Sequence, residues 1–352
     1  MIRPAASYGG STGCVSVIFL NCDEDEMAKP KVYATHSLFE AAREILKKGC
    51  EVEYWAKAGR PPREEVLRRV KDKEGLICLL TEKVNEELLS AAPKLRIAAN
   101  VAVGFDNIDL AACTKRGVAA TNTPGVLDET TADFAWTLMM AVARRLSEGE
   151  ALARSGKWKN WDLDQLVGTD VWGKTLGIVG FGRIGRAMAR RASGFQMKVI
   201  YTDAVRAPAE AERELKAEFR GMNALLSESD FISLHVPLLP ETRGLFDAAK
   251  FSKMKSTAFL INTSRGPVVK EAELVAALES GKIAGAGLDV YENEPLIHRG
   301  LKRVNVVLAP HIASASLETR TKMACMAAEN VIALFTGKRP PNILNPEVLK
   351  TP

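Results

Sequence analysis

The 352-residue sequence lacks several features that mark particular classes of protein. It has no run of about 18 apolar residues, so no segment is predicted to cross a membrane as a helix. Its six cysteines form no C-x-x-C pair and show no metal-ligand spacing, so no metal site is predicted. The net charge of +5 is spread along the chain without a basic run, which argues against a nucleic-acid partner.

What remains is the composition of a globular chain. Hydrophobic residues make up 47% and charged residues 26% of the sequence, and its length predicts two domains. Several cysteines stand in apolar stretches, as Cys78 does, and we expect them to be reduced core thiols. Because reduced thiols are typical of the cytoplasm, we expect a cytoplasmic protein.

The first 26 residues differ from the rest of the chain. Their apolar stretch, 15–20, is too short for a signal peptide, and an acidic run follows it at 23–26. A new start at Met27 leads directly into a strand pattern. We therefore expect residues 1–26 to be an upstream extension or a start-site artefact without fixed structure.

From residue 31 onward, apolar stretches alternate with helical patterns. Strands are predicted over 32–35, 52–55, 75–80, 96–99 and 118–121, and helices over 38–48, 61–70 and 84–91. A second unit begins at residue 174, with strands over 176–179, 198–202, 231–234, 258–262, 284–289 and 306–308, and helices over 186–192, 271–280 and 316–335. This alternation predicts an α/β fold with parallel sheets that carry helices on both faces.

Between the two units lie segments that indicate contacts or movement. The turn signal Asn122-Thr-Pro-Gly125 is predicted to be a hinge. A helix predicted over 131–146 carries too much apolar surface to face solvent, so we expect it between domains or subunits. Trp158 and Trp161 stand among polar residues, and exposed tryptophans of this kind are typical of an interface.

The most specific motif is Gly180-Phe-Gly182-Arg-Ile-Gly185, a G-x-G-x-x-G. A predicted strand precedes it, a helical pattern follows it, and Asp203 ends the next strand 18 residues after Gly185. This context indicates a dinucleotide-binding site. Gly180 allows the tight turn, Gly182 lets a pyrophosphate approach the backbone, and Gly185 lets helix and strand pack closely. The phosphates would face the helix N-terminus.

The residue type at position 203 bears on which dinucleotide binds. A carboxylate accepts hydrogen bonds from the ribose 2′-hydroxyl and repels a 2′-phosphate. Asp203 therefore favours NAD, with NADH as the reduced form. Arg206 lies just beyond and leaves NADP open.

Three residues of the second unit follow predicted strand ends, where ligands bind in open parallel sheets: Arg265, Glu294 and His311. The fork of an arginine can hold a carboxylate and polarise a carbonyl. Histidine titrates in the range that suits a proton donor, and a carboxylate keeps the imidazole protonated and oriented. Behind a dinucleotide motif, this set indicates a 2-keto acid reductase.

Each of the three residues also has an ordinary explanation when it is taken alone. Arg265 could form a surface ion pair, His311 could start a capped helix, and Glu292 could replace Glu294. Three other histidines are weaker candidates for chemistry. We expect His235 to form a wall of the site and His36 and His298 to lie in loops.

Several longer motifs connect the chain to a known family. They are Gly180 to Gly185, Ser233-Leu-His-Val-Pro237 with Pro240-Glu-Thr242, Asn262-Thr-Ser-Arg-Gly266, Gly287-Leu-Asp-Val-Tyr-Glu-Asn-Glu-Pro295 and Pro310-His-Ile312. In order and spacing, this set resembles the D-isomer-specific 2-hydroxyacid dehydrogenases. The stretches 79–83, 103–109, 123–127 and 155–158 make the chain most similar to the glyoxylate/hydroxypyruvate reductases within that family.

The resemblance implies two doubly wound parallel-sheet domains. A Rossmann cofactor domain would span 125–311, and a smaller, discontinuous flavodoxin-like substrate domain would combine 27–124 with 312–352. The implied reaction is NAD(P)H-dependent reduction of glyoxylate to glycolate or of hydroxypyruvate to D-glycerate. The helix from 131 and the tryptophan segment would form a homodimer.

The resemblance also assigns residues to roles. Arg265 would bind substrate, Glu294 would pair with the histidine, and His311 would donate the proton. Backbone N–H groups at Val103 and Gly104 would hold the substrate carboxylate. The cofactor would be bound by Gly180, Phe181, Gly182, Arg183, Ile184, Gly185, Asp203, Val236, Pro237, Thr242, Thr263, Ser264, Asp289, Ala313 and Thr131.

The sequence departs from the family at one position and leaves two alternatives open. Ala313 stands where the family usually has glycine, and alanine resists a positive φ, so we expect a turn that alanine accepts. The first alternative is another D-2-hydroxyacid dehydrogenase, acting on 3-phosphoglycerate or D-lactate. The second is a dehydrogenase-like protein that senses NADH without turnover.

Overall fold

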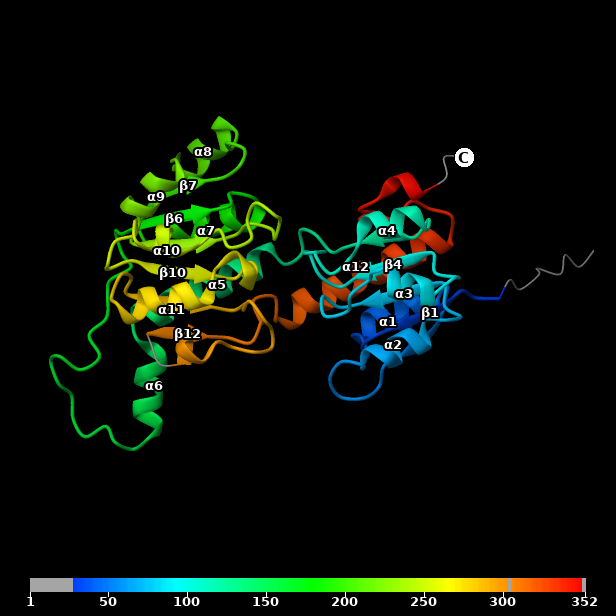
Figure 1. Ribbon diagram of the computed structural model, residues 1–352, viewed down its shortest axis with the longest axis horizontal. Helices are drawn as coiled ribbons and strands as arrows, with labels where there is room; N and C mark the ends of the chain where they lie inside the picture. The colour runs from blue at the N-terminus through cyan, green and yellow to red at the C-terminus, as the bar shows by residue number, and fades with distance from the viewer. Residues whose placement is uncertain (1–27, 303–304, 350–352) are drawn as a thin grey trace, which may run out of the picture.

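Two parallel sheets organise the computed structural model, which describes residues 28–302 and 305–349 (Figure 1). The first sheet has five strands in the order β2-β1-β3-β4-β5, and the second has seven in the order β12-β11-β10-β9-β6-β7-β8. All their strand pairings are parallel. The prediction of an α/β fold with two parallel-sheet units is confirmed.

The first lobe is built on the five-stranded sheet. Its elements are β1 (Lys31–Ala34), α1 (Glu40–Lys47), β2 (Glu51–Tyr54), α2 (Arg63–Arg69), β3 (Gly75–Cys78), α3 (Glu86–Ala91), β4 (Ile97–Asn100), α4 (Leu110–Lys115) and β5 (Ala119–Thr121). Every residue of β3 and β4 is buried, because helices cover both faces of the sheet. Asn85 and Asp109 cap α3 and α4 by accepting a backbone N–H in the first turn.

The second lobe is built on the seven-stranded sheet. Its elements are α5 (Asp128–Ala143), α6 (Leu146–Arg154), β6 (Thr175–Val179), α7 (Arg183–Gly194), β7 (Lys198–Thr202), α8 (Ala209–Leu215), β8 (Ala217–Phe219), α9 (Met222–Glu228), β9 (Phe231–Leu234), α10 (Ala248–Phe251), β10 (Phe259–Asn262), α11 (Glu271–Glu279), β11 (Gly285–Leu288) and β12 (Val306–Leu308), with short 3₁₀ turns at Gly266–Val268 and Arg299–Lys302.

The end of the chain returns to the first lobe. Helix α12 (Leu317–Phe335) packs against α1 and β4, and the segment after it, with a 3₁₀ turn at Pro346–Val348, reaches β5. There Leu344 N–H donates to Ala120 O at 2.8 Å, and Asn345 Oδ1 accepts from Ala120 N–H at 2.8 Å. Figure 1 shows α12 running from the junction of the lobes into the first lobe. We therefore propose to group 27–124 with 312–352, and to treat 125–311 as the other domain.

The helix expected over 131–146 differs from the prediction. It is two helices, α5 and α6, separated where Arg145 takes a positive φ of 52°. Helix α5 packs against α7 and strands β10 and β11, so most of its apolar surface belongs to the core of the second lobe and does not lie between domains. Its first turn does reach the junction, where Thr130 Oγ1 lies 2.6 Å from Thr319 Oγ1 of α12.

Four of the six cysteines fall within the described residues, and all four are free thiols. Cys50, Cys78 and Cys113 are buried, as expected, and burial raises the pKa of Cys50 and Cys113 to about 11. Across the described ranges, no helix has both the length and the apolar character needed to cross a membrane. The segment 1–26, for which we expect no fixed structure, lies outside the described residues.

Candidate active site

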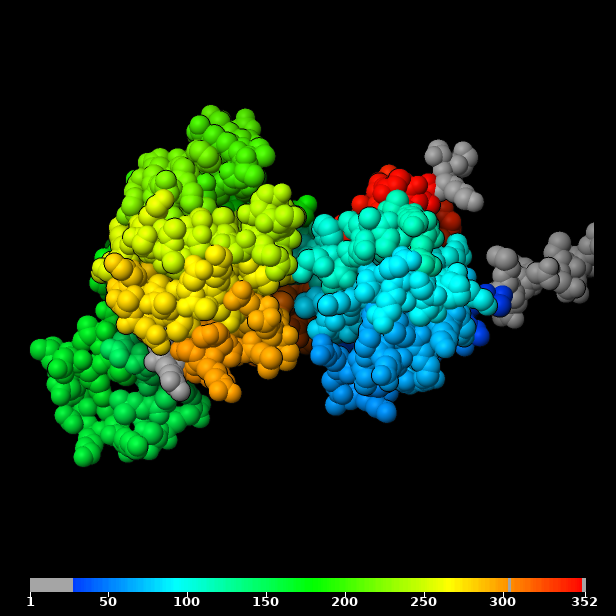
Figure 2. Space-filling model, viewed as in Figure 1, coloured from blue at the N-terminus to red at the C-terminus, as the bar shows by residue number. Residues whose placement is uncertain are grey.

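A cleft of about 470 Å³ lies between the two lobes. Figure 2 shows the deep groove that separates them on one face of the molecule. Its walls come from the loops that follow the carboxyl ends of strands in both sheets, which is where ligands bind in open parallel sheets. The sequence-predicted residues that line it are Val103, Gly104, Thr131, Gly182, Arg183, Ile184, Val236, Pro237, Thr263, Ser264, Arg265, His311 and Ala313.

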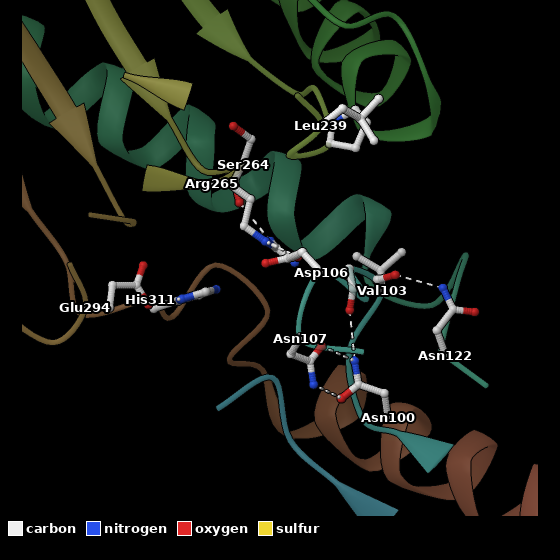
Figure 3. A network of polar contacts seen from close by, with 12 residues as sticks. Asn100, Val103, Asp106, Asn107, Asn122, Leu239, Ser264, Arg265, Glu294 and His311 are labelled. Atoms are coloured by element: carbon white, nitrogen blue, oxygen red, sulfur yellow. Dashed lines mark hydrogen bonds and ion pairs between the residues drawn. The ribbon is translucent and has the colours of Figure 1, made fainter. Parts of the chain in front are cut away.

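On the first lobe, three asparagines hold the loop 101–107 that follows β4. Asn100 Nδ2 donates to Gly104 O at 2.9 Å and to Asn107 Oδ1 at 3.1 Å, and Asn122 Nδ2 donates to Val103 O at 2.7 Å (Figure 3). The carbonyl oxygens of Val103 and Gly104 accept hydrogen bonds from these amides. The N–H groups of the same two residues have no protein acceptor among the described residues. Two free N–H groups at a cleft wall can bind a carboxylate.

Arg265 extends from the second lobe toward this loop. Its Nη1 donates to Ser264 O at 2.8 Å, and its Nε donates to Asp106 Oδ1 at 2.9 Å. Its Nη2 lies so close to Gly104 that a Cβ there would be 1.6 Å away, so any larger residue at this position would displace the guanidinium. The guanidinium is thus placed beside the free N–H groups of the first lobe.

His311 and Glu294 form a hydrogen-bonded pair on the same side of the cleft. His311 Nδ1 lies 2.8 Å from Glu294 Oε2, and Tyr291 N–H donates to Glu294 Oε1 at 3.1 Å. Burial alone would raise the pKa of Glu294. The hydrogen bond and charge of His311, together with the Tyr291 N–H, outweigh burial and hold that pKa below its ordinary value. Glu292 is engaged elsewhere, since it accepts from Glu271 N–H at 2.9 Å.

A buried carboxylate fixes the turn that carries His311. Asp289 is fully buried and accepts from the N–H groups of Ile312 at 2.7 Å and Ala313 at 2.8 Å. Burial raises the pKa of Asp289 above its ordinary value although these two bonds oppose the shift. His311, with a φ of 56°, takes the left-handed conformation, and Ala313 does not. The expectation of a turn that alanine accepts is confirmed.

The glycine-rich turn has the geometry that a dinucleotide requires. Gly180 has a φ of 91°, and a Cβ at Gly185 would lie 2.1 Å from Gly180 O, so both positions demand glycine. A Cβ at Gly182 would meet nothing within 4 Å, which leaves open space at the N-terminus of α7. The N–H groups of Gly182, Arg183 and Ile184 have no protein acceptor in the described part of the chain, and such groups bind phosphate.

Asp203 lies beside this turn. Its carboxylate accepts from Phe181 N–H at 2.6 Å and from Ala204 N–H at 2.7 Å. Arg206 is paired with Glu212 through two contacts of 2.9 Å, so its charge is already compensated. Of these two groups, Asp203 is the one in contact with the glycine-rich turn.

Other predicted residues do not line the cleft. Those outside the lining are Gly180, Phe181, Gly185, Asp203, Thr242, Asp289 and Glu294. Thr242 uses its hydroxyl within its own loop, donating to Pro237 O at 2.6 Å and accepting from Leu239 N–H at 2.8 Å. In contrast, Thr263 Oγ1 is buried at the cleft and has no partner among the described residues, which leaves it free for a ligand.

Within the described ranges, the remaining histidines form no ion pair with a carboxylate. His235 lines the cleft, its Nε2 lies 2.8 Å from Ser233 Oγ, and burial lowers its pKa to about 3. It is therefore neutral near pH 7, and the expectation of a wall residue is confirmed. His36 is exposed, and His298 is exposed and accepts from Gly300 N–H at 3.2 Å.

The sequence analysis missed the residues that support the site from the first lobe. Asn100 ends β4 and Asn122 follows β5, so the strand-end rule that selected Arg265 applies to them as well. The turn signal at 122–125 predicts only a hinge and does not single out Asn122 as a site residue. Asp106 gave no signal of its own, because its partner Arg265 is 159 residues away in the sequence.

Comparison with known proteins identifies the family to which the chain belongs. The family model for "D-isomer specific 2-hydroxyacid dehydrogenase, NAD binding domain" matches residues 136–313. The chain belongs to the D-isomer specific 2-hydroxyacid dehydrogenase family and is an NAD(P)-dependent oxidoreductase.

Individual relatives are similar over nearly their whole length. A glyoxylate reductase of Korarchaeum cryptofilum is 51% identical over 325 residues, covering 92% of this chain and 98% of the relative. The crystal structure of a Thermus thermophilus protein matches with a TM-score of 0.84 at 42% identity, covering 89% of this chain and 99% of that one. An NADPH-dependent glyoxylate/hydroxypyruvate reductase of Sinorhizobium meliloti, crystallised with NADP and malonate, matches with a TM-score of 0.80 at 32% identity, covering 92% and 99%.

Proposed function

We propose that this chain reduces glyoxylate to glycolate and hydroxypyruvate to D-glycerate with a nicotinamide cofactor. One observation carries the proposal: Arg265, His311 with its partner Glu294, and two free N–H groups of the opposite lobe meet at one cleft, which all but Glu294 line. The names of the relatives at about 50% identity support the same substrates.

The proposed mechanism assigns one task to each group. The substrate carboxylate is held by the N–H groups of Val103 and Gly104 and by Arg265 Nη2. His311 uses Nδ1 to bind Glu294, so its Nε2 carries the proton that passes to the carbonyl oxygen. The charged Glu294 stabilises the imidazolium before that transfer. A nicotinamide held at the glycine-rich turn would supply the hydride for the carbonyl carbon.

We further propose that NADH is preferred over NADPH. The carboxylate of Asp203, beside the glycine-rich turn, would repel a 2′-phosphate, and the nearby Arg206 is paired with Glu212. The first turn of α7 and Gly182 would hold the pyrophosphate, and the free hydroxyl of Thr263 would face the bound cofactor.

We also propose that two copies of the chain form a homodimer. The segment after α6 extends away from the second lobe (Figure 1). Its side chains Trp158, Trp161, Leu163 and Val167 are between 58% and 81% exposed. Monomeric proteins rarely leave such a group of large apolar side chains in solvent.

The direct experiment is an initial-rate assay of NADH oxidation with glyoxylate, hydroxypyruvate, pyruvate and 3-phosphohydroxypyruvate, repeated with NADPH. We expect the highest kcat/KM with glyoxylate or hydroxypyruvate. A higher value with 3-phosphohydroxypyruvate or pyruvate would assign the chain to the 3-phosphoglycerate or D-lactate alternative. NADH binding without turnover across the panel would instead support the NADH-sensing alternative.

A further inference from the structure

Two glutamates that the proposed mechanism does not use join the segments that carry Arg265 and Glu294. Glu271 begins α11, and Glu292 lies in the loop after β11. The backbone N–H of Glu271 donates to Glu292 Oε2 at 2.9 Å, and the backbone N–H of Glu292 donates to Glu271 Oε1 at 2.5 Å. The Glu271–Glu292 pair is therefore held by two reciprocal hydrogen bonds.

The position of the Glu271 side chain is unfavourable for a charge. The residue is only 5% exposed, and burial raises the pKa of Glu271 above its ordinary value. Within 28–302 and 305–349, neither Glu271 nor Glu292 forms an ion pair with a cation. Glu271 thus lacks the compensation that a salt bridge would give to a buried acid. Its carboxylate instead makes a fixed bond to the loop that carries Glu294.

The two segments that this pair joins are packed backbone to backbone. Strands β10 and β11 are parallel neighbours in the sheet, so the segments after them leave it at the same edge. Beyond that edge, a Cβ at Gly266 would lie 1.9 Å from the backbone carbonyl of Tyr291. The turn that carries Arg265 therefore lies directly against the loop that carries Glu294.

Inside this loop, further bonds connect Glu292 with the imidazole of the site. Tyr291, which precedes Glu292, donates its N–H to Glu294 Oε1 at 3.1 Å. The other oxygen, Glu294 Oε2, lies 2.8 Å from His311 Nδ1, and Figure 3 shows the two side chains next to each other. Fixing the backbone at 291–292 therefore fixes the carboxylate that orients the imidazole.

We propose that Glu271 and Glu292 are positioning residues for proton transfer, whose reciprocal hydrogen bonds hold Glu294 against His311. The inference rests on the proposed function, in which His311 donates the proton. Neither Glu271 nor Glu292 lines the cleft, so the pair acts on the reaction through Glu294. A catalytic side chain keeps its productive geometry only when its supporting groups are themselves fixed.

The variants separate the hydrogen bonds of the pair from its charges. Glu271→Ala and Glu292→Ala each remove one acceptor. Glu271→Gln and Glu292→Gln each keep an acceptor oxygen and remove the charge. The matched control is Glu279→Ala, which removes an exposed acid at the C-terminal end of the same helix.

The measurements are kcat and KM for glyoxylate across the pH range in which imidazole titrates, the Kd for NADH, and urea unfolding. The pH profile is informative because reduction needs the protonated imidazole of His311, which the charge of Glu294 stabilises. The other charged groups that act on the Glu294–His311 contact are Asp289 and Arg265, and both stay unchanged in every variant.

We expect both alanine variants to lower kcat about 10-fold, because a displaced Glu294 no longer orients the proton donor. The loss of activity at alkaline pH should move about 0.5–1 pH unit lower, because the imidazolium is less stable without a carboxylate beside it. The Kd for NADH should stay at the wild-type value. Both glutamine variants and Glu279→Ala should keep the wild-type kcat and pH profile.

Alanine variants with the wild-type kcat and pH profile would overturn the inference, even if they unfold more readily, because the pair would then only stabilise the fold. An equal change in the glutamine variants would also overturn it, since the charges and not the hydrogen bonds would then act on His311. If Glu271→Ala does not fold, Glu292→Ala decides, because Glu292 is exposed.

Failure of the proposed function gives a different result, in which the wild-type protein reduces none of the keto acids. The pair is then tested without turnover, by NMR titration of the NADH-loaded protein with isotope-labelled histidine. The His311 signal is assigned by its loss in His311→Gln. A midpoint that is lower in the alanine variants supports the positioning role, and an unchanged midpoint contradicts it.

Discussion

At the scale of single residues, two histidines near the same cleft differ in the environment that surrounds them. His311 lies 2.8 Å from a carboxylate that can stabilise its charged form. His235 contacts only the Ser233 hydroxyl, and burial lowers its pKa to about 3. A proton donor needs a proton at neutral pH, so of these two His311 is the one that fits the role.

His235 also predicts how stability depends on pH. Its pKa is about 3 in the folded chain and near 6.5 in the unfolded chain, so between these values the unfolded chain binds more protons. Stability should therefore fall as the pH drops below about 6.5. The free energy of unfolding is measured in urea at pH 7 and at pH 5. From pH 7 to pH 5, the wild-type protein should lose about 1–2 kcal/mol more of this free energy than His235→Gln does. Identical pH dependence in the two proteins would contradict the assignment.

Asp203 predicts the coenzyme preference. In Asp203→Asn, the ratio of kcat/KM for NADPH to that for NADH should rise about 10-fold, because the charge that repels a 2′-phosphate is gone. The matched control is Glu214→Gln, an exposed acid on α8 of the same lobe. A ratio that stays at the wild-type value in Asp203→Asn would show that other groups set the preference.

At the scale of secondary-structure elements, two glycines of the glycine-rich turn have different surroundings. Gly185 is packed against the backbone, since an added Cβ would lie 2.1 Å from Gly180 O. Gly182 faces open space, with nothing within 4 Å of an added Cβ. The same residue type is therefore required by packing at one position and leaves space for a ligand at the other.

The two glycines give opposite predictions for the same substitution. Gly185→Ala should lower the free energy of unfolding by about 1–3 kcal/mol or more, because backbone atoms must move to admit the methyl group. Gly182→Ala should unfold like the wild-type protein but bind NADH about 10-fold more weakly, because the methyl group occupies the space for the pyrophosphate. Urea unfolding and fluorescence titration with NADH measure the two effects. The reverse pattern would show that the turn does not hold the cofactor.

The elements also show what a sequence can predict. Strands such as β7 and β9 are found at the predicted residues, because buried parallel strands are continuous apolar runs between turn residues. The predicted end of the helix over 131–146 is wrong, because the break depends on a positive φ at Arg145 that nothing in the local sequence requires. The short helices α8 and α10 were not predicted, because the helical signal is weak over so few residues.

At the scale of the whole molecule, the site exists only because two lobes meet. Gly104 and Arg265 are far apart in the sequence, yet their close approach defines the expected carboxylate position. The candidate residues of each lobe were predictable from strand ends and motifs. The Asp106–Arg265 contact was not predictable, because it depends on how the lobes are placed and no local pattern encodes that placement.

The exposed segment after α6 predicts assembly. The double variant Trp161→Glu, Leu163→Glu should run as a monomer in analytical ultracentrifugation, whereas the wild-type protein should run as a dimer, because two charges in an apolar interface are costly. Val205→Glu is the matched control, since Val205 is 79% exposed on another loop of the same lobe. A monomeric wild-type protein would refute the proposed dimer.

The most direct test of the whole account is the rate of glyoxylate reduction by His311→Gln, measured together with its affinity for NADH. We predict a kcat lowered roughly 10²–10⁴-fold, because the proton donor is lost, and a Kd for NADH close to that of the wild-type protein. A near-normal kcat in this variant would show that His311 is not the proton donor and would contradict the proposed mechanism.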